Sequence, residues 1–174
     1  FLSSLDIRVE VIENDLLNIP RISQLTQKTN QFNLTTKRYT ENEVQGFMSS
    51  DEYLVCSFTV SDKFGDNGIT GLSIVKINDN EAYIDTFLMS CRIIGRKIEF
   101  SFFNLLINEL ESRGINRIKA SYIESQKNSQ VKNFYSNFNF NESSIEEFKT
   151  NYELDINNYK LKKIKTIKIK WKIK

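Results

Sequence analysis

The sequence of 174 residues contains no histidine and only two cysteines. Without an imidazole, the chain cannot form a Ser-His-Asp triad, a Cys-His pair or a histidine metal site. Cys56 and Cys91 are too few for a zinc cluster or a disulfide framework. Acid–base chemistry must therefore fall to Glu, Asp, Lys, Tyr, Cys or water, and we expect no metal in this domain.

Long apolar runs and strong charge are also absent. No run of about 18 apolar residues suggests a membrane span, and no signal-peptide pattern opens the chain. The net charge of +2 is too small to indicate nucleic acid by itself, and basic residues do not interleave with exposed aromatic ones. We expect a cytoplasmic, reducing setting, with no membrane and no nucleic acid among the partners.

The composition that remains is typical of a folded domain. Hydrophobic residues make up 40% and charged residues 26% of the sequence, which fits a globular protein with a real core. The chain opens with Phe1 rather than an initiator Met. We therefore expect one domain, residues 1–174, excised from a longer polypeptide.

Hydrophobic periodicity and turn residues predict the element order β-α-α-β-β-β-α-β-α-β-β. Helices are expected at 18–29 with Pro20 in the first turn, at 40–50 from a capping box, at 96–114 before a C-terminal glycine, and at 131–138. Strands are expected at 7–13, 53–63, 69–78, 81–90, 117–124, near 152–156 and at 166–173. The glycines of residues 65–68 predict the turn of a hairpin.

The most informative stretch is the strand 81–90 and the turn that follows it. Arg92-Ile93-Ile94-Gly95-Arg96-Lys97 opens the longest helix, and a helix N-terminus attracts phosphate. Gly95 lacks the Cβ that would keep an anion away, and Arg92 and Arg96 can add charge-assisted contacts. The strand edge could bind an extended, amide-bearing ligand. Phosphate beside such an arm describes phosphopantetheine, although a solvated turn would have the same sequence.

This order, with an R/Q-x-x-G-x-G/A turn after the fourth strand, resembles the Gcn5-related N-acetyltransferase (GNAT) fold. The resemblance implies an α/β (α+β) domain with a mixed, mostly antiparallel central sheet flanked by helices. In that fold a central strand splays from its neighbour and admits pantetheine. The residues that it places along phosphopantetheine or CoA (acetyl-CoA) are Leu88, Ser90, Arg92, Ile94, Gly95, Arg96, Lys97 and Asn128.

Four blocks resemble the C-terminal, acyltransferase-like half of the FkbH family. They are residues 21–36, 62–68 and 90–96, and Lys127-Asn128 followed by Phe134-Tyr135. The resemblance implies loading of a glyceryl unit, for example for polyketide extender supply, from a phosphoglycerate donor onto the phosphopantetheine thiol of an acyl carrier protein. It also implies an N-terminal haloacid-dehalogenase (HAD)-type phosphatase domain as a partner. An acetyl-CoA-dependent N-acetyltransferase and a catalytically silent carrier-docking module remain alternatives.

One departure bears on the choice between these alternatives. The turn of the GNAT fold usually ends in Gly or Ala, where this chain has Lys97. This disfavours CoA, which has a pyrophosphate and a ribose phosphate, more than it disfavours a carrier with one phosphodiester.

Two residues are candidates for catalysis. Cys91 lies beside Arg92 and a helix N-terminus, which favour a thiolate, so it could hold an acyl group as a thioester; the alternative is a small buried strand residue. Tyr135 lies where acetyltransferases of this fold often place the acid that protonates the leaving thiolate. It could instead pack its helix on the sheet with Phe134 and Phe138.

Polar residues between the first two helices are expected to border the substrate. Amides, hydroxyls and cations that suit a glyceryl group or a phosphate are found at Asn30, Asn33, Thr35, Lys37 and Arg38. A solvated loop is the alternative, and Asn128 could simply cap the helix after it. The last strand alternates lysines with Ile167, Ile169, Trp171 and Ile173. Its lysines could steer an acidic carrier protein or protect an exposed sheet edge.

Overall fold

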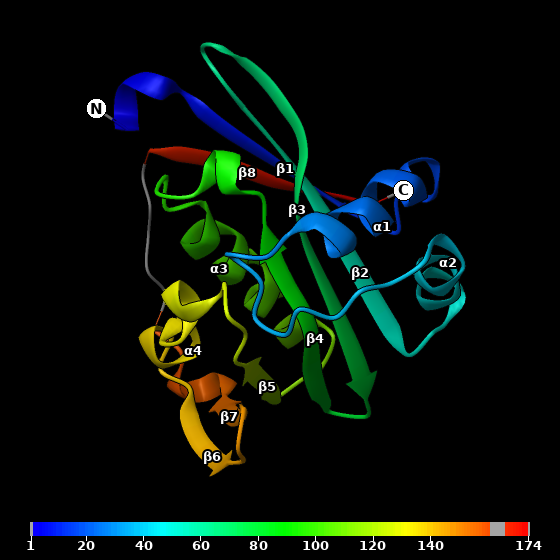
Figure 1. The fold of residues 1–174 in the computed structure, drawn as a ribbon, viewed down its shortest axis with the longest axis vertical. Coiled ribbons are helices and arrows are strands. Elements are labelled where there is room, and N and C mark those ends of the chain that lie inside the picture. Colours follow the sequence, from blue (N-terminus) through cyan, green and yellow to red (C-terminus); the bar gives the residue numbers. More distant parts are fainter. Residues whose placement is uncertain (1, 161–165, 174) are drawn as a thin grey trace.

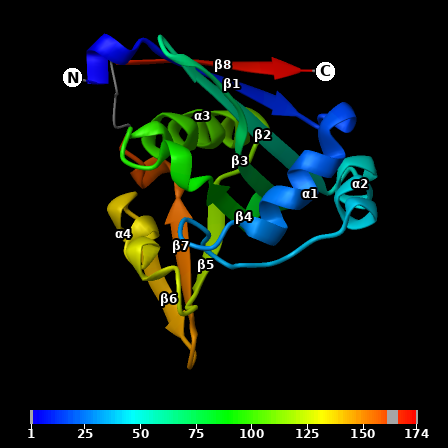
Figure 2. The same ribbon diagram turned by 45° about the horizontal axis from the view of Figure 1, so that its top comes forward.

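A computed structural model gives the structure of residues 2–160 and 166–173. Within these residues, eight strands form one mixed sheet in the order β6-β7-β5-β4-β3-β2-β1-β8. Figures 1 and 2 show β8 beside β1 at one end of the sheet and β6 at the other. No helix of the described residues is long and apolar enough to cross a membrane.

The helices and strands follow the predicted order, with one additional strand. The strands are β1 Ile7–Glu13, β2 Tyr53–Asp62, β3 Gly65–Asn78, β4 Glu81–Met89, β5 Arg117–Ile123, β6 Asn141–Ile145, β7 Lys149–Asp155 and β8 Ile167–Ile173. The helices are α1 Ile19–Lys28, α2 Glu41–Ser49, α3 Ile98–Ser112 and α4 Phe134–Asn137. The predicted capping box is confirmed, because the Thr40 hydroxyl accepts from the backbone N–H of Glu43 at 3.2 Å.

Two local predictions are wrong, and one strand was not predicted. The β2–β3 turn consists of Lys63 and Phe64 rather than residues 65–68, because Asp62 already pairs with Gly65. The helix predicted at 131–138 is reduced to α4, preceded by a 3₁₀ turn, Ser129–Val131. Strand β6 was not predicted, since all five of its side chains are exposed and carry no alternating pattern.

Each face of the sheet carries its own core, as the alternation of strand side chains requires. One core holds Val55, Ile74 and Leu88 against α1 and α2. The other holds Phe58, Phe87 and the apolar face of α3. Helices α1 and α2 accordingly lie together, apart from α3, in Figure 2. Gly71 leaves room for the Phe58 ring, because a Cβ at this position would lie 1.8 Å from that ring.

Strands β4 and β5 diverge half-way along their length. Their parallel pairing covers only residues 81–84 and 117–120, although β4 runs on to Met89 and β5 to Ile123. The divergence begins at Asp85, an extra residue in β4 that shifts its register with β3 between Ile74 and Val75. A β-bulge bends and twists its strand, which accounts for the splay. The predicted splayed strand pair is confirmed.

The lysines of β8 lie on an edge strand that is paired in parallel with β1. Lys172 Nζ lies 3.0 Å from a carboxylate oxygen of Glu10, and Lys168 Nζ lies 3.6 Å from one of Asp6. The predicted edge position is confirmed. A role in steering a carrier protein stays a prediction, and the side chain of Ile173 lies outside the described residues.

Candidate functional site

The gap between β4 and β5 is filled by the chain's own residues 32–35, called the inserted segment below. The Leu34 N–H donates to the Phe87 carbonyl at 3.2 Å, and the Met89 N–H donates to the Phe32 carbonyl at 3.0 Å. On the other side, the Ile123 N–H donates to the Leu34 carbonyl at 2.9 Å. The prediction that this edge of β4 is free for an amide-bearing ligand is therefore wrong at Phe87 and Met89.

Asn128 fastens the inserted segment to β5. Its Nδ2 donates to the carbonyls of Asn33 and Ile123, each at 2.9 Å. Its Oδ1 accepts from the Ser125 N–H at 2.9 Å and the Tyr122 hydroxyl at 3.1 Å. The side chain is fully buried and uses both donors and both lone pairs. The helix-capping alternative is wrong, because Asn128 makes no side-chain cap bond.

The inserted segment is held firmly. Phe32 is 6% exposed and Leu34 0%, and such burial stabilises by roughly 1.5–3 kcal/mol per side chain. Five hydrogen bonds join it to β4, β5 and Asn128, including one of 2.9 Å from the Thr35 hydroxyl to the Asp85 carbonyl, each contributing about 0.5–1.5 kcal/mol. These contributions are comparable with or larger than the ~8 kcal/mol that a micromolar ligand gains on binding. A ligand of ordinary affinity would not displace the segment.

The turn after the inserted segment is built around Asn33. Its Oδ1 accepts from the Thr36 N–H at 2.9 Å, and its Nδ2 donates to the Thr29 carbonyl at 3.1 Å. Thr36 has φ +56°, a left-handed conformation that is unfavourable for a β-branched residue. The Thr36 hydroxyl is buried without a partner among the described residues. The fold therefore accepts local strain to place this segment in the gap.

A basic cavity of about 700 Å³ opens beside the inserted segment. Its walls come from α1, the connection after it, the end of β4 and the β5–α4 connection, and they are Arg21, Leu25, Lys28, Thr29, Asn30, Gln31, Phe32, Met89, Ser90, Cys91, Arg92 and Lys127. No carboxylate is among these residues. None of the four cations forms an ion pair with another described residue.

Two guanidinium groups of the basic cavity lie close enough to repel each other. Burial, and then the charge of Arg92, lower the pKa of Arg21. The Arg21 guanidinium is fixed by donating to the Ile69 carbonyl at 3.1 and 3.2 Å. Uncompensated cations on a fixed frame attract an anionic ligand. The basic cavity therefore has the electrostatics of a phosphate or carboxylate site.

Four of the predicted site residues meet in this cavity: Asn30, Ser90, Cys91 and Arg92. The alternative that Cys91 is a small buried residue is wrong, because Cys91 is exposed, whereas Cys56 is buried. The Ser90 hydroxyl accepts from the Arg92 N–H at 3.4 Å and thereby shapes the turn that carries the thiol.

The rest of the predicted arm contacts lie outside the basic cavity. Leu88 is fully buried in the core under α1 and α2, and Ile94 packs on the other core. The N–H groups of Gly95, Arg96 and Lys97 have no partner among the described residues, yet none of the three lines the cavity. The Arg96 guanidinium is bound to Asp62 at 2.8 Å.

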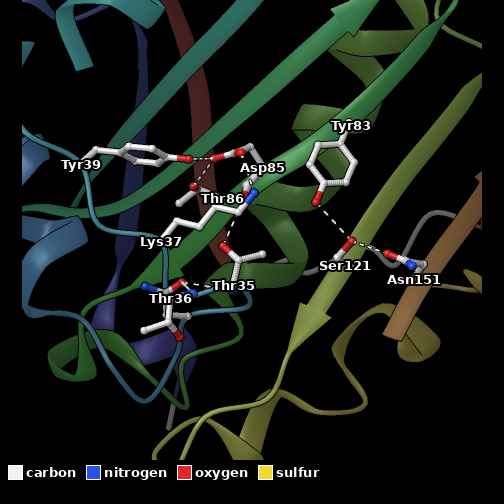
Figure 3. A network of polar contacts seen from close by, with 10 residues as sticks. Thr35, Thr36, Lys37, Tyr39, Tyr83, Asp85, Thr86, Ser121 and Asn151 are labelled. Carbon is white, nitrogen blue, oxygen red and sulfur yellow. Dashed lines mark hydrogen bonds and ion pairs between the residues drawn. The ribbon is translucent and has the colours of Figure 1, made fainter. Parts of the chain in front are cut away.

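The remaining predicted substrate residues surround Asp85 or hold the connection between α1 and α2 in place. Lys37 Nζ lies 2.9 Å and the Tyr39 hydroxyl 2.6 Å from the Asp85 carboxylate, as Figure 3 shows. Burial alone would lower the pKa of Lys37, but the bond to Asp85 outweighs it and raises this pKa. Arg38 donates to the carbonyls of Thr26 and Thr29 and to Asn30 Oδ1. Both predicted cations are thus already partnered.

Tyr135 is buried in the core with its hydroxyl unpaired among the described residues. The side chain is 1% exposed, and the hydroxyl has no hydrogen-bond partner among the described residues. Burial, together with the nearby Tyr83 and Asp85, raises the pKa of Tyr135 well above its ordinary value. The phenol is therefore a neutral donor. The packing alternative holds as well, since its ring lies 5.1 Å from that of Phe140 between centroids.

No protein-family model and no curated protein matches the sequence, but solved structures do. One similar structure is the ribosomal-protein-S18-alanine N-acetyltransferase from Escherichia coli, with a TM-score of 0.65 and 15% identity over 85% of this chain and 94% of that one. Another is spermidine N-acetyltransferase from Vibrio cholerae in complex with CoA and spermine, with a TM-score of 0.65 and 13% identity over 87% of this chain and 97% of that one. A third is the GNAT domain of S. lividans PAT, with a TM-score of 0.63 and 14% identity over 83% of this chain and 89% of that one.

The chain has the GNAT fold. At these identities the likeness shows the fold alone, and the FkbH and HAD context stays a prediction. The residues of this GNAT-fold domain fit a phosphate-bearing arm at the basic cavity, where uncompensated cations lie. The residues along β4 do not fit the extended, amide-bearing part of the arm, because the inserted segment is bound there. Among the described residues, no three carboxylate or thiol side chains gather as metal ligands would.

Two residues of the GNAT-fold domain were missed from the sequence. Asp85 is the bulge residue of β4 and the acceptor for Lys37, Tyr39 and the Thr86 hydroxyl. An acidic residue in the middle of an apolar strand was the signal for it. Arg21 was not predicted to line a site, and its signal was a cation in the first turn of a helix, where it opposes the helix dipole.

Proposed function

We propose that this domain transfers acyl groups through the thiol of Cys91 to the thiol of a phosphopantetheine arm. The observation that supports it is an exposed thiol inside a cavity that holds four uncompensated cations. Such a cavity concentrates substrates that carry both a phosphate and an acyl group. In the role that the FkbH resemblance implies, the acyl unit is glyceryl, the donor is a phosphoglycerate, and the partners are an acyl carrier protein and a HAD-type domain.

The chemistry needs two exchanges at one sulfur. The Cys91 thiolate attacks the carbonyl carbon of a donor with phosphate on its carboxyl group, the new C–S bond forms, and the C–O bond breaks to release phosphate. Arg92 and Arg21 stabilise the departing charge. The acceptor thiolate then attacks the same carbon, and the bond to Cys91 breaks to restore its thiolate.

A second candidate is an acetyl-CoA-dependent N-acetyltransferase. It is favoured by the similar structures, of which one was solved with CoA, and by the unpaired phenol of Tyr135, a donor suited to a leaving thiolate. The inserted segment occupies the edge of β4, so the arm of CoA would also have to bind in the basic cavity. Strong thermal stabilisation by acetyl-CoA, with none by the glyceryl thioester of 4′-phosphopantetheine, would favour this candidate over the first.

Acyl capture tests the first candidate. The domain is incubated with the glyceryl thioester of 4′-phosphopantetheine, and intact mass is measured before and after hydroxylamine. One labile glyceryl adduct is expected on wild type and on Cys56→Ala, and none on Cys91→Ser. Equal adduct on Cys91→Ser, or none on wild type, would remove Cys91 from the reaction.

A further inference from the structure

We propose that the inserted segment is a permanent part of the sheet, and that a phosphopantetheine arm is bound in the basic cavity instead of along β4. The phosphodiester of the arm then lies among Arg21, Arg92 and Lys127. The second half of this proposal rests on the proposed function, while the permanence of the segment does not.

The inserted segment already makes the contacts that an amide-bearing chain would make in the gap. Its peptide groups present alternating N–H and C=O groups to Phe87 and Met89 of β4. Its Asn33 carbonyl takes a donor of Asn128, a residue predicted to contact the arm. The gap therefore has the chemistry of a peptide-like site, and the chain itself saturates that site.

Nothing about the inserted segment suggests a detachable plug. The Phe32 ring packs with its centroid 6.1 Å from that of Phe87 and 5.7 Å from that of Phe134. Removing the segment would expose Phe32 and Leu34 and leave the donors of Met89, Ile123 and Asn128 unpaired in a buried site. Both losses oppose displacement.

The basic cavity adjoins the first residue of the inserted segment, Phe32. Phe32 and Met89, which are joined by a hydrogen bond, both line it. A chain that enters between α1 and the turn after β4 reaches Cys91 without entering the gap. The cations come from three separate segments, α1, the turn after β4 and the β5–α4 connection, so that they can surround one phosphate. Arg21 is fixed in place by its bonds to the Ile69 carbonyl.

Titration with 4′-phosphopantetheine tests the placement of the arm. Calorimetry on wild type, Arg92→Gln and Lys127→Gln should show affinity reduced by about tenfold in each variant, as the loss of one charge-assisted contact predicts. Lys132→Gln is the matched control, because Lys132 is an exposed lysine of the same connection that does not line the cavity. Equal affinity in Arg92→Gln, Lys127→Gln and wild type would overturn the placement.

Amide hydrogen exchange tests the permanence of the inserted segment. The N–H groups of Leu34, Met89 and Ile123 should be protected in the free domain and equally protected when 4′-phosphopantetheine is bound. Faster exchange at Leu34 on binding, or none of this protection in the free domain, would overturn permanence. Absence of any binding would overturn both the placement and the proposed function, while exchange in the free domain still decides the status of the segment.

Discussion

At the scale of single residues, the turn before α3 holds Lys97 in a backbone conformation that favours glycine. Lys97 precedes the helix with φ +63° and makes no side-chain cap bond. A side chain in this left-handed region costs about 1–2 kcal/mol, and glycine does not pay this steric cost. Lys97 is thus a source of strain in the backbone.

Lys97→Gly should stabilise the domain by about 1 kcal/mol, because it removes this strain. Urea unfolding measures the change. Lys132→Gly is the control with the opposite sign, since Lys132 has ordinary helical angles, where glycine costs roughly 0.5–1 kcal/mol. A loss of stability in Lys97→Gly would contradict the assigned backbone conformation.

Glu99, in the first turn of α3, has one carboxylate oxygen buried without a partner among the described residues. Burial raises the pKa of Glu99 above its ordinary value of 4.5, against a smaller opposing effect of its own backbone N–H. The folded state therefore holds this proton more tightly than the unfolded state. Stability is lost as pH rises above the unfolded pKa, and the loss is complete above the folded pKa.

Glu99→Gln should therefore be more stable than wild type at pH 7, by about 1 kcal/mol, because the neutral amide removes a buried charge and keeps the shape of the side chain. The difference should shrink as pH falls to 4, where the wild-type carboxyl is protonated. Melting temperatures from pH 4 to 8 measure this, with the exposed Glu111→Gln as control. A Glu99→Gln variant less stable than wild type at pH 7 would refute the assignment.

At the scale of elements, the sequence predicted the helices and strands that have one apolar face and did not predict those that lack one. The long helix and strands β1, β2, β4 and β5 were found from periodicity. Gly65 and Gly68 do have positive φ, but they lie in an irregular part of β3, where its register with β2 shifts, so the glycines indicated the wrong turn. Strand β6 has no buried side chain to reveal it.

The inserted segment could not be predicted as sheet structure, because polar residues surround it and its pairing with β4 is a single bridge between Asn33 and Leu88. The alternation of apolar Phe32 and Leu34 with polar Asn33 and Thr35 was its sequence signal. Its attachment depends on Asn128, which donates one hydrogen bond to the Asn33 carbonyl of the segment and one to the Ile123 carbonyl of β5.

Asn128→Ala should destabilise the domain by about 3 kcal/mol, because it leaves several buried groups unpaired. Asn128→Asp should be similarly damaging, since it keeps the shape and an acceptor but loses both donors. Chemical denaturation and amide exchange at Ile123 measure the effect. Asn157→Ala, at an exposed position, is the control. Unchanged stability of Asn128→Asp would mean that the inserted segment is not fastened by these donors.

At the scale of the whole molecule, the predicted GNAT fold and its splayed strand pair are confirmed. The inserted segment between the two strands was not predicted. The bulge at Asp85 separates β4 from β5, as expected for a fold that admits an arm. The chain then fills this opening with residues 32–35. Sequence reasoning placed Ser90, Cys91 and Arg92 together because they are neighbours, whereas the meeting of Arg21, Lys28 and Lys127 with them depends on tertiary packing.

The central claim is that an arm reaches Cys91 through the basic cavity, guided by its phosphate. The most direct test compares the rates at which the Cys91 thiol reacts with the disulfide of 4′-phosphopantetheine and with the disulfide of pantetheine, which lacks phosphate. The account predicts that the phosphate speeds the reaction by roughly tenfold at low salt, that Arg92→Gln reduces this preference, and that Lys132→Gln retains it in full. Equal rates for the two disulfides in wild type, or an undiminished preference in Arg92→Gln, would contradict it.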